Sequence, residues 1–186
     1  MITLVYGGSS SGKSGFAEDL VCHSTSKNKY YLATMGVRDE ESVARIERHR
    51  QIRAGKGFVT LEHERDVYNA IPEIESIDLG DFSTDSEADG TIVLLECMSN
   101  LVANEMFRDG EIYPAEQVVN KILGDIEELA ECVSSMVIVS NNVFEDGIDY
   151  DPGTQEYLKA LGMINRAIAK LSDDVYEVVV GIGIKL

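Results

Sequence analysis

The sequence predicts a single α/β domain over residues 1–186, with a mostly parallel sheet that carries helices on both faces. Three observations lead to this fold class. Short β-branched runs alternate with segments of helical spacing, which is typical of parallel strands joined by crossover helices. Four of the runs are apolar almost throughout, as expected when helices cover both faces of a sheet. The length suits one domain, and no internal repeat divides the chain.

The first half of the chain alternates between predicted strands and helices. A β-branched run over residues 2–6 ends at a Gly-Gly turn, and residues 13–22 place apolar side chains at helical spacing. A second strand is expected at residues 30–34. Residues 39–53 predict a helix whose first turn holds three carboxylates, where the helix dipole favours negative charge. A third strand is expected at residues 58–61.

The second half begins with an acidic stretch over residues 73–90. We interpret it as a solvated loop, because Gly, Ser and Asp interleave there and a strand-like run follows at once. The remaining predicted elements are a strand at 91–95, helices at 98–106 and 114–132, a strand at 136–140, a helix at 154–171, and strands at 175–180 and 182–185.

The charge of the chain is unevenly distributed. The 33 Asp and Glu outnumber the 16 Lys and Arg, which gives a formal net charge of −17 and argues against a nucleic-acid partner. Residues 1–65 nevertheless carry 10 basic and 8 acidic side chains, a net charge of +2, whereas residues 66–186 carry −19. Any anion is therefore expected to bind in the first third of the chain.

The three cysteines, Cys22, Cys97 and Cys132, are widely spaced and have no CxxC pattern. They predict buried thiols in a reducing cytoplasm rather than disulfides or a zinc site. The N-terminal residues show no signal peptide, and no run approaches the roughly 20 apolar residues of a membrane span. We therefore predict a cytoplasmic protein.

A phosphate-binding loop follows the first strand and opens the first helix. Its residues match G-x-x-x-x-G-K-[ST] and are Gly7, Gly8, Ser9, Ser10, Ser11, Gly12, Lys13 and Ser14. Backbone amides of such a loop wrap phosphates, and the helix N-terminus adds partial positive charge. Lys13 is expected to reach the β- and γ-phosphates, while Ser14 offers a hydroxyl to Mg²⁺.

Glu96 is the candidate acidic partner of that loop. It follows four apolar strand residues, at the strand end where a P-loop enzyme holds Mg²⁺ directly or through water. The alternative is an ordinary strand-end glutamate.

The densest basic segment of the chain contains Arg45, His49 and Arg53. Their spacing of four residues places all three on one helix face. His49 could bind a nucleotide phosphate, or its neutral imidazole could attack that phosphate to form a phosphoramidate, with the neighbouring cations favouring the neutral ring. A solvated face paired with the carboxylates of residues 39–41 is the alternative.

Together these motifs resemble the bifunctional adenosylcobinamide kinase/adenosylcobinamide-phosphate guanylyltransferase family of cobalamin (vitamin B12) biosynthesis. The resemblance extends over nearly the whole chain. It includes the P-loop, the Arg-Ile-x-x-His-x-x-x-Arg helix, the Leu-Leu-Glu-Cys strand end, a Ser-Asn-x-Val segment and the closing Val-Gly-Ile-Gly-Ile-Lys. It implies phosphorylation of adenosylcobinamide by ATP or GTP, then GMP transfer from GTP through a guanylylated histidine.

By position, the resemblance implies that His49 is the guanylylated residue and that Arg45 and Arg53 flank it. It implies roles for Lys13 and Glu96 in catalysis, and it matches Glu62 to a nucleotide-binding Glu after the third strand. Adenosylcobinamide and its phosphate would be the substrates, and the fold would be a RecA-like P-loop domain that is commonly trimeric.

The sequence also departs from the family pattern. Ser9 and Ser10 replace the usual Ala and Arg of the loop, and in residues 141–149 Asn142 replaces a Glu and Phe144 a Gly. Two alternatives therefore stay open. One is a degenerate paralogue that binds nucleotide without full activity, and the other is a P-loop kinase for another small alcohol.

Overall fold

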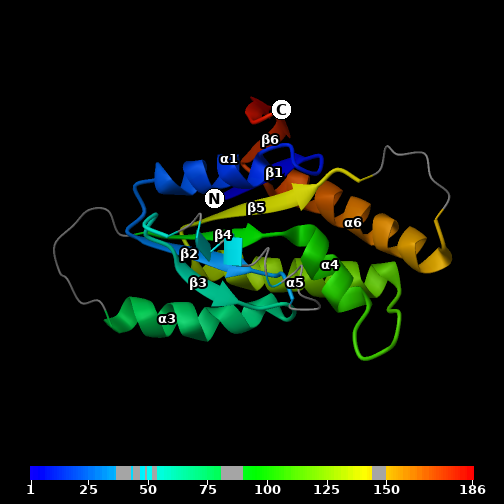
Figure 1. The fold of residues 1–186 in the computed structure, drawn as a ribbon. Coiled ribbons are helices and arrows are strands. Elements are labelled where there is room, and N and C mark those ends of the chain that lie inside the picture. The colour runs from blue at the N-terminus through cyan, green and yellow to red at the C-terminus, as the bar shows by residue number, and fades with distance from the viewer. Residues whose placement is uncertain (37–42, 44–46, 49, 52–53, 81–89, 144–149) are drawn as a thin grey trace.

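A computed structural model describes residues 1–36, 43, 47–48, 50–51, 54–80, 90–143 and 150–186 of the chain. The seven described strands form one sheet in the order β3-β2-β4-β5-β1-β6-β7 (Figure 1). Neighbouring strands are parallel except for β6 and β7, which pair antiparallel. The predicted mostly parallel sheet is therefore confirmed.

The described elements agree with the predicted ones to within two residues at each end, except over residues 67–80, where the structure has a 3₁₀ turn and a helix that were not predicted. The strands are β1 (Ile2–Gly7), β2 (Asn28–Ala33), β3 (Val59–Glu62), β4 (Thr91–Glu96), β5 (Ser135–Asn141), β6 (Asp174–Val179) and β7 (Ile182–Lys185). The helices are α1 (Lys13–Cys22), the 3₁₀ turn η1 (Val67–Asn69), α3 (Ala70–Gly80), α4 (Met98–Met106), α5 (Ala115–Cys132) and α6 (Pro152–Leu171).

Helices cover both faces of the sheet, as Figure 1 shows with α1 above it and α3 and α5 below. Helix α1 packs on β1, β4 and β5, whereas on the other face α3 packs on β2, α4 on β5 and α6 on β1. Helix α5 completes that second layer by packing against α4 and α6. The three-layer arrangement predicted from the alternating elements is confirmed.

The core lies on the two sides of the sheet, and neighbouring strand residues face opposite sides. Leu4 and Val93 belong to the cluster under α3 to α6, while Val5 and Leu94 belong to the cluster under α1. All four are at most 2% exposed. Period-two alternation sends both sets of side chains into apolar surroundings, which explains why these strands are apolar almost throughout.

The loop predicted for residues 73–90 is wrong for its first part, because residues up to Gly80 belong to helix α3. Ile74 on this helix is 2% exposed, and Ile71 packs beside it against the core. Glu73 and Glu75, beside these apolar positions, are exposed. Residues 81–89 lie outside the described residues.

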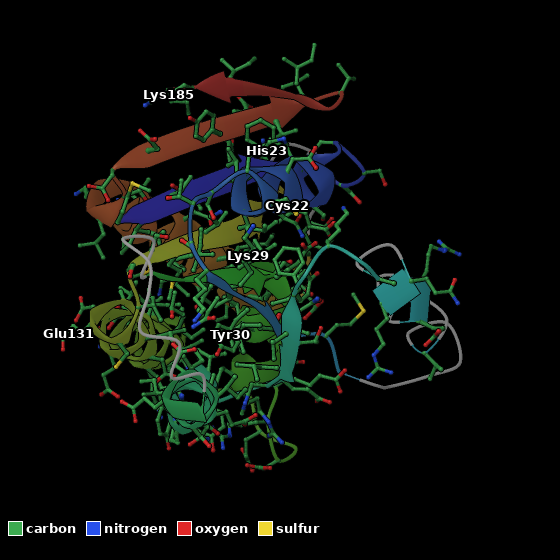
Figure 2. All side chains as sticks on the ribbon, turned by 90° about the vertical axis from the view of Figure 1, so that its left-hand side faces the viewer. Cys22, His23, Lys29, Tyr30, Glu131 and Lys185 are labelled. Atoms are coloured by element: carbon green, nitrogen blue, oxygen red, sulfur yellow. The ribbon has the colours of Figure 1, made fainter. Side chains whose placement is uncertain are left out.

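Asp78 ties α3 to the sheet. It accepts hydrogen bonds from the Tyr30 hydroxyl at 2.5 Å, from Asn28 Nδ2 at 2.8 Å and from Thr91 Oγ1 at 2.6 Å. Burial and the bond to Asp78 raise the pKa of Tyr30, so its hydroxyl remains a donor at neutral pH. Figure 2 shows Tyr30 in the interior, with Lys185 and Glu131 at the margins of the molecule.

A network of charged side chains joins η1, α4 and α5. We call Asp66, Glu105, Arg108, Lys121 and Asp125 the Lys121 cluster. Lys121 Nζ lies 2.8 Å from Asp66, 3.2 Å from Glu105 and 2.6 Å from Asp125. Arg108 lies 3.0 Å from the same Glu105, whose side chain is 2% exposed and also accepts the Asp66 amide at 2.7 Å.

The predicted helix over residues 39–53 lies largely outside the described residues. The expectation of three buried thiols is wrong, because Cys132, the last residue of α5, is exposed. Cys22 and Cys97 are partly exposed.

None of the helices in the described part of the chain has the length and apolar character that a bilayer-spanning segment needs.

Candidate active site

A pocket of about 580 Å³ opens at the edge of the sheet where β1, β4 and β5 end. Carboxyl ends of parallel strands are where α/β folds bind ligands, because the connecting loops and helix N-termini converge there. The residues that line this pocket are Ser9, Ser10, Ser11, Gly12, Lys13, Ser14, Met35, Glu96, Cys97, Ser99, Asn100 and Asn141. The predicted P-loop and Glu96 therefore meet in one place.

The loop between β1 and α1 adopts a backbone with two left-handed residues. Gly12 has a φ of 89° immediately before α1 begins at Lys13, and Ser10 has a φ of 58°. The Ser11 amide donates to the Gly8 carbonyl at 3.3 Å, which closes a turn within the loop. This geometry wraps backbone amides around the pocket above the N-terminus of α1, where an anion is favoured.

Lys13 is the buried cation of the pocket. Its residue is 8% exposed, and its Nζ donates to the Gly8 carbonyl at 3.1 Å. Burial lowers the pKa of Lys13, although nearby Cys97 and Glu96 oppose that shift. A phosphate group would give this desolvated ammonium the negative partner that favours its charged form.

Ser14 and Glu96 come together from different elements. The Ser14 hydroxyl, in the first turn of α1, donates to Glu96 Oε1 at the end of β4. A hydroxyl and a carboxylate side by side are hard oxygen ligands of the kind that Mg²⁺ prefers. Among the described residues no group of three or more His, Cys, Asp or Glu could hold a metal ion. The pair suits Mg²⁺ because this ion is usually bound by one or two carboxylates together with substrate phosphates and waters.

Another wall of the pocket is built by residues that the sequence reasoning did not select for a site. Ser99 Oγ accepts a hydrogen bond from Asn141 Nδ2 at 2.6 Å and lies 3.0 Å from Cys97 Sγ. Burial raises the pKa of the Cys97 thiol, so it stays protonated at neutral pH and is no thiolate nucleophile. A signal that could have found Asn141 is the polar residue at the end of an apolar strand, since Asn141 ends β5 as Glu96 ends β4.

The hairpin of β6 and β7 supports the P-loop from behind. The Gly181 amide donates to the Ser11 carbonyl at 2.7 Å. A Cβ atom on Gly12 would lie 2.9 Å from Gly181 Cα, and one on Gly7 would lie 2.6 Å from the Val178 carbonyl oxygen. The two glycines are thus needed for close approach of the hairpin, in addition to the φ that Gly12 adopts.

The remaining predicted site residues are placed as follows. Arg45, His49 and Arg53 lie outside the described residues. Glu62 ends the edge strand β3, is exposed and forms an ion pair with Arg50. The structure does not bring Glu62 among the residues that line the pocket.

Comparison with known proteins gives two full-length relatives and a family. Residues 3–186 match the family described as cobinamide kinase / cobinamide phosphate guanyltransferase. The chain is 31% identical over 197 residues to the bifunctional adenosylcobalamin biosynthesis protein CobU of Escherichia coli strain K12, covering 100% of this chain and 99% of that protein. It is 28% identical over 195 residues to the protein of that name from Salmonella typhimurium strain LT2, with the same coverage.

A solved structure agrees with this assignment at the level of the fold. A solved ATPase domain superposes with a TM-score of 0.53 at 15% identity, over 95% of this chain and 68% of that one. This likeness confirms the predicted P-loop NTPase fold, and with the family match it indicates that the chain binds a nucleotide. By the match over residues 3–186, the chain belongs to the cobinamide kinase / cobinamide phosphate guanyltransferase family.

Proposed function

We propose that the chain phosphorylates adenosylcobinamide and then transfers GMP from GTP to the adenosylcobinamide phosphate that it has made. The observation that carries this proposal is the pocket in which Lys13, Ser14 and Glu96 converge beside the loop amides. A buried ammonium, a helix N-terminus and open backbone amides are what the triphosphate of ATP or GTP requires. The family match names the two reactions.

In the first step the hydroxyl oxygen of adenosylcobinamide attacks the γ-phosphorus of the nucleotide. An oxygen–phosphorus bond forms while the bond from that phosphorus to the β,γ-bridging oxygen breaks, so the nucleoside diphosphate leaves and the hydroxyl proton passes to solvent. Lys13 offsets the charge that develops on the transferring oxygens, and the loop amides hold the remaining phosphates.

In the second step a neutral ring nitrogen of His49 attacks the α-phosphorus of GTP and pyrophosphate leaves. A phosphate oxygen of adenosylcobinamide phosphate then attacks the same phosphorus, which frees the imidazole and yields adenosyl-GDP-cobinamide. Arg45 and Arg53 offset charge on the α-phosphate oxygens. The support for these roles is the basic segment in an otherwise acidic chain, together with the family match.

Ser14 and Glu96 are the residues that would hold Mg²⁺. The bound ion would supply Lewis-acid polarisation of the phosphate oxygens. We further propose a role for Glu62 in nucleotide binding, a homotrimeric assembly and a cytoplasmic location, all by resemblance to the family.

Retention of radiolabel on the protein tests the covalent step. After incubation with GTP labelled in the α-phosphate, the denatured wild-type protein is expected to keep the label, whereas His49→Ala is expected to lose it. His23→Ala is the matched control, because His23 caps the far end of α1 from the P-loop and its ring contacts the Asp19 carbonyl at 2.7 Å. Wild-type protein without label would overturn the guanylyl transfer through His49.

A product assay separates the two activities. Adenosylcobinamide with ATP alone is expected to give the phosphate, and addition of GTP is expected to give the GDP ester. Nucleotide binding without either product would favour the degenerate paralogue, and turnover of other alcohols alone would favour a different kinase.

A further inference from the structure

We propose that Asn141 positions the attacking hydroxyl of the alcohol in the kinase step by accepting a hydrogen bond from it at Oδ1. The inference rests on the proposed function and adds a residue that contacts the substrate. It starts from a buried side-chain atom that has no partner among the described residues.

Asn141 occupies a fixed place next to the P-loop. It ends β5 and pairs in register with Gly7, the first glycine of the loop. The following amide, of Asn142, donates to the Gly7 carbonyl at 2.8 Å, which fixes the end of β5 against the start of the loop. Asn141 therefore lines the same pocket as Lys13 and Glu96.

The orientation of the Asn141 side chain is set by its neighbours. Its Nδ2 donates to Ser99 Oγ at 2.6 Å, so the amide group has one donor engaged. Its main-chain carbonyl accepts from Asn165 Nδ2 at 3.3 Å, and Asn165 Oδ1 in turn accepts from Ser140 Oγ at 2.5 Å. Because both side chain and main chain are held, Oδ1 points in one direction only.

Within the described part of the chain, Asn141 Oδ1 is buried and has no hydrogen-bond partner. A buried acceptor left unpaired destabilises the folded chain, so such an atom in a pocket indicates a ligand that donates to it. Phosphate oxygens cannot do so, because they are acceptors themselves. The Lys13 ammonium has three donors, but in this structure it donates to the Gly8 carbonyl and not to Asn141 Oδ1. The alcohol hydroxyl is the donor that the kinase reaction brings into this pocket.

The hydrogen bond would help the reaction by orientation. With its proton directed at Oδ1, the hydroxyl oxygen presents a lone pair to the γ-phosphorus in line with the bond that breaks. A neutral amide does not take up the proton, which leaves to solvent as the oxygen–phosphorus bond forms. Asn141 is thus expected to raise the rate of transfer to the alcohol and to leave nucleotide binding nearly unchanged.

Three variants test the inference, with rates of adenosylcobinamide phosphate formation and nucleotide affinities measured in parallel. Asn141→Ala is expected to lower kcat about 10- to 100-fold at unchanged nucleotide Kd, since loss of orientation costs rate of that order. Asn141→Asp keeps an acceptor at this position and is expected to recover part of the loss. Asn120→Ala, on the exposed side of α5, is the matched control and is expected to behave as wild type.

Three results would overturn the inference and leave the proposed function intact. If Asn141→Ala weakens nucleotide binding as much as it slows turnover, the carboxamide contacts the phosphates. If the variant regains the full rate at high Mg²⁺, the carboxamide contacts a metal-bound water. Equal rates for Asn141→Ala and wild type would also show that Oδ1 does not position the hydroxyl. A wild-type protein that binds nucleotide but forms no adenosylcobinamide phosphate would overturn the proposed function, and this inference with it.

Discussion

The nucleotide pocket and the Lys121 cluster both contain a lysine among polar side chains, but their charges are arranged in opposite ways. In the pocket, burial lowers the pKa of Lys13, and two buried oxygens, Ser11 Oγ and Asn141 Oδ1, lack partners among the described residues. In the cluster, burial also acts on Lys121, but its carboxylate neighbours outweigh burial and raise its pKa.

The difference indicates which region is built for a ligand and which for stability. Asp66, Glu105 and Asp125 already surround Lys121, so no further anion is needed there. Lys13 has a neutral carbonyl as its hydrogen-bond acceptor and gains most when a phosphate arrives. Polar groups that are satisfied in the folded chain stabilise it, whereas unsatisfied groups in a pocket mark a binding site.

The largest expected effect is that of Lys13→Met on activity. Loss of the cation is expected to reduce phosphoryl transfer roughly 100- to 1,000-fold, the range seen when one preorganised electrostatic donor is removed. The free energy of unfolding is expected to stay the same or rise, because a desolvated charge is replaced by an apolar chain of similar length. Initial rates and urea unfolding measure the two quantities. A variant that unfolds more easily but retains its rate would reverse the comparison.

The matched change in the other region, Lys121→Met, is expected to affect stability instead. Removing one partner of a buried charge network costs about 3–5 kcal/mol, and the 28% exposure of the Lys121 side chain reduces this to about 2 kcal/mol. Urea unfolding measures the loss, and turnover of the folded protein is expected to remain near wild type. Lys159→Met is the control, because its pair with Glu156 at 3.8 Å is half exposed. A loss of nucleotide affinity in Lys121→Met would show that the regions are coupled.

The smallest expected effect is a pH dependence that separates affinity from stability. Binding needs the Lys13 ammonium, and its folded-state pKa is lowered from the ordinary 10.5. Nucleotide affinity is therefore full below that lowered pKa and is lost as pH rises through it. The contribution of Lys13 to the stability of the free protein has the opposite sign, being present above the unfolded pKa and lost as pH falls through the folded one.

Affinity titrations between pH 7 and the onset of alkaline unfolding, repeated with Lys13→Arg, would test this. The arginine stays charged throughout, so its affinity is expected to show no such fall. Parallel curves for the two proteins would contradict the assignment to Lys13.

Much of the fold could be predicted because the strands carry their own signal. Apolar runs such as Val93 and Leu94 need cover on both faces, and the P-loop pattern places a strand before it and a helix after it. Helix α3 could not be predicted in the same way, because the seven carboxylates of residues 73–90 dominated the interpretation of that stretch and concealed the three-residue spacing of Ile71 and Ile74. Local composition outweighs periodicity in that segment.

The site could be predicted where a motif is local and not where contacts are distant in sequence. Lys13 and Ser14 follow from eight consecutive residues, and Glu96 from its position after a strand. The role inferred for Asn141 depends on Ser99, which β5 and α4 bring together only in the folded chain. The distribution of charge along the sequence was a limited guide for the same reason. No Lys or Arg lies between Asp66 and Phe107, yet in the folded chain Arg108 and Lys121 both form ion pairs with Asp66.

The contact of the β6–β7 hairpin with the P-loop bears on the order of events during synthesis. Gly7 to Ser14 leave the ribosome long before Val178 and Gly181, which hold the loop from behind. Because β1 pairs with β5 and β6 in the sheet, the strand before the loop also waits for late partners. A fragment ending before Gly181 would retain the complete P-loop sequence pattern but lack the hairpin that supports the loop. The presence of the motif in a truncated product is therefore not sufficient evidence that the product binds nucleotide.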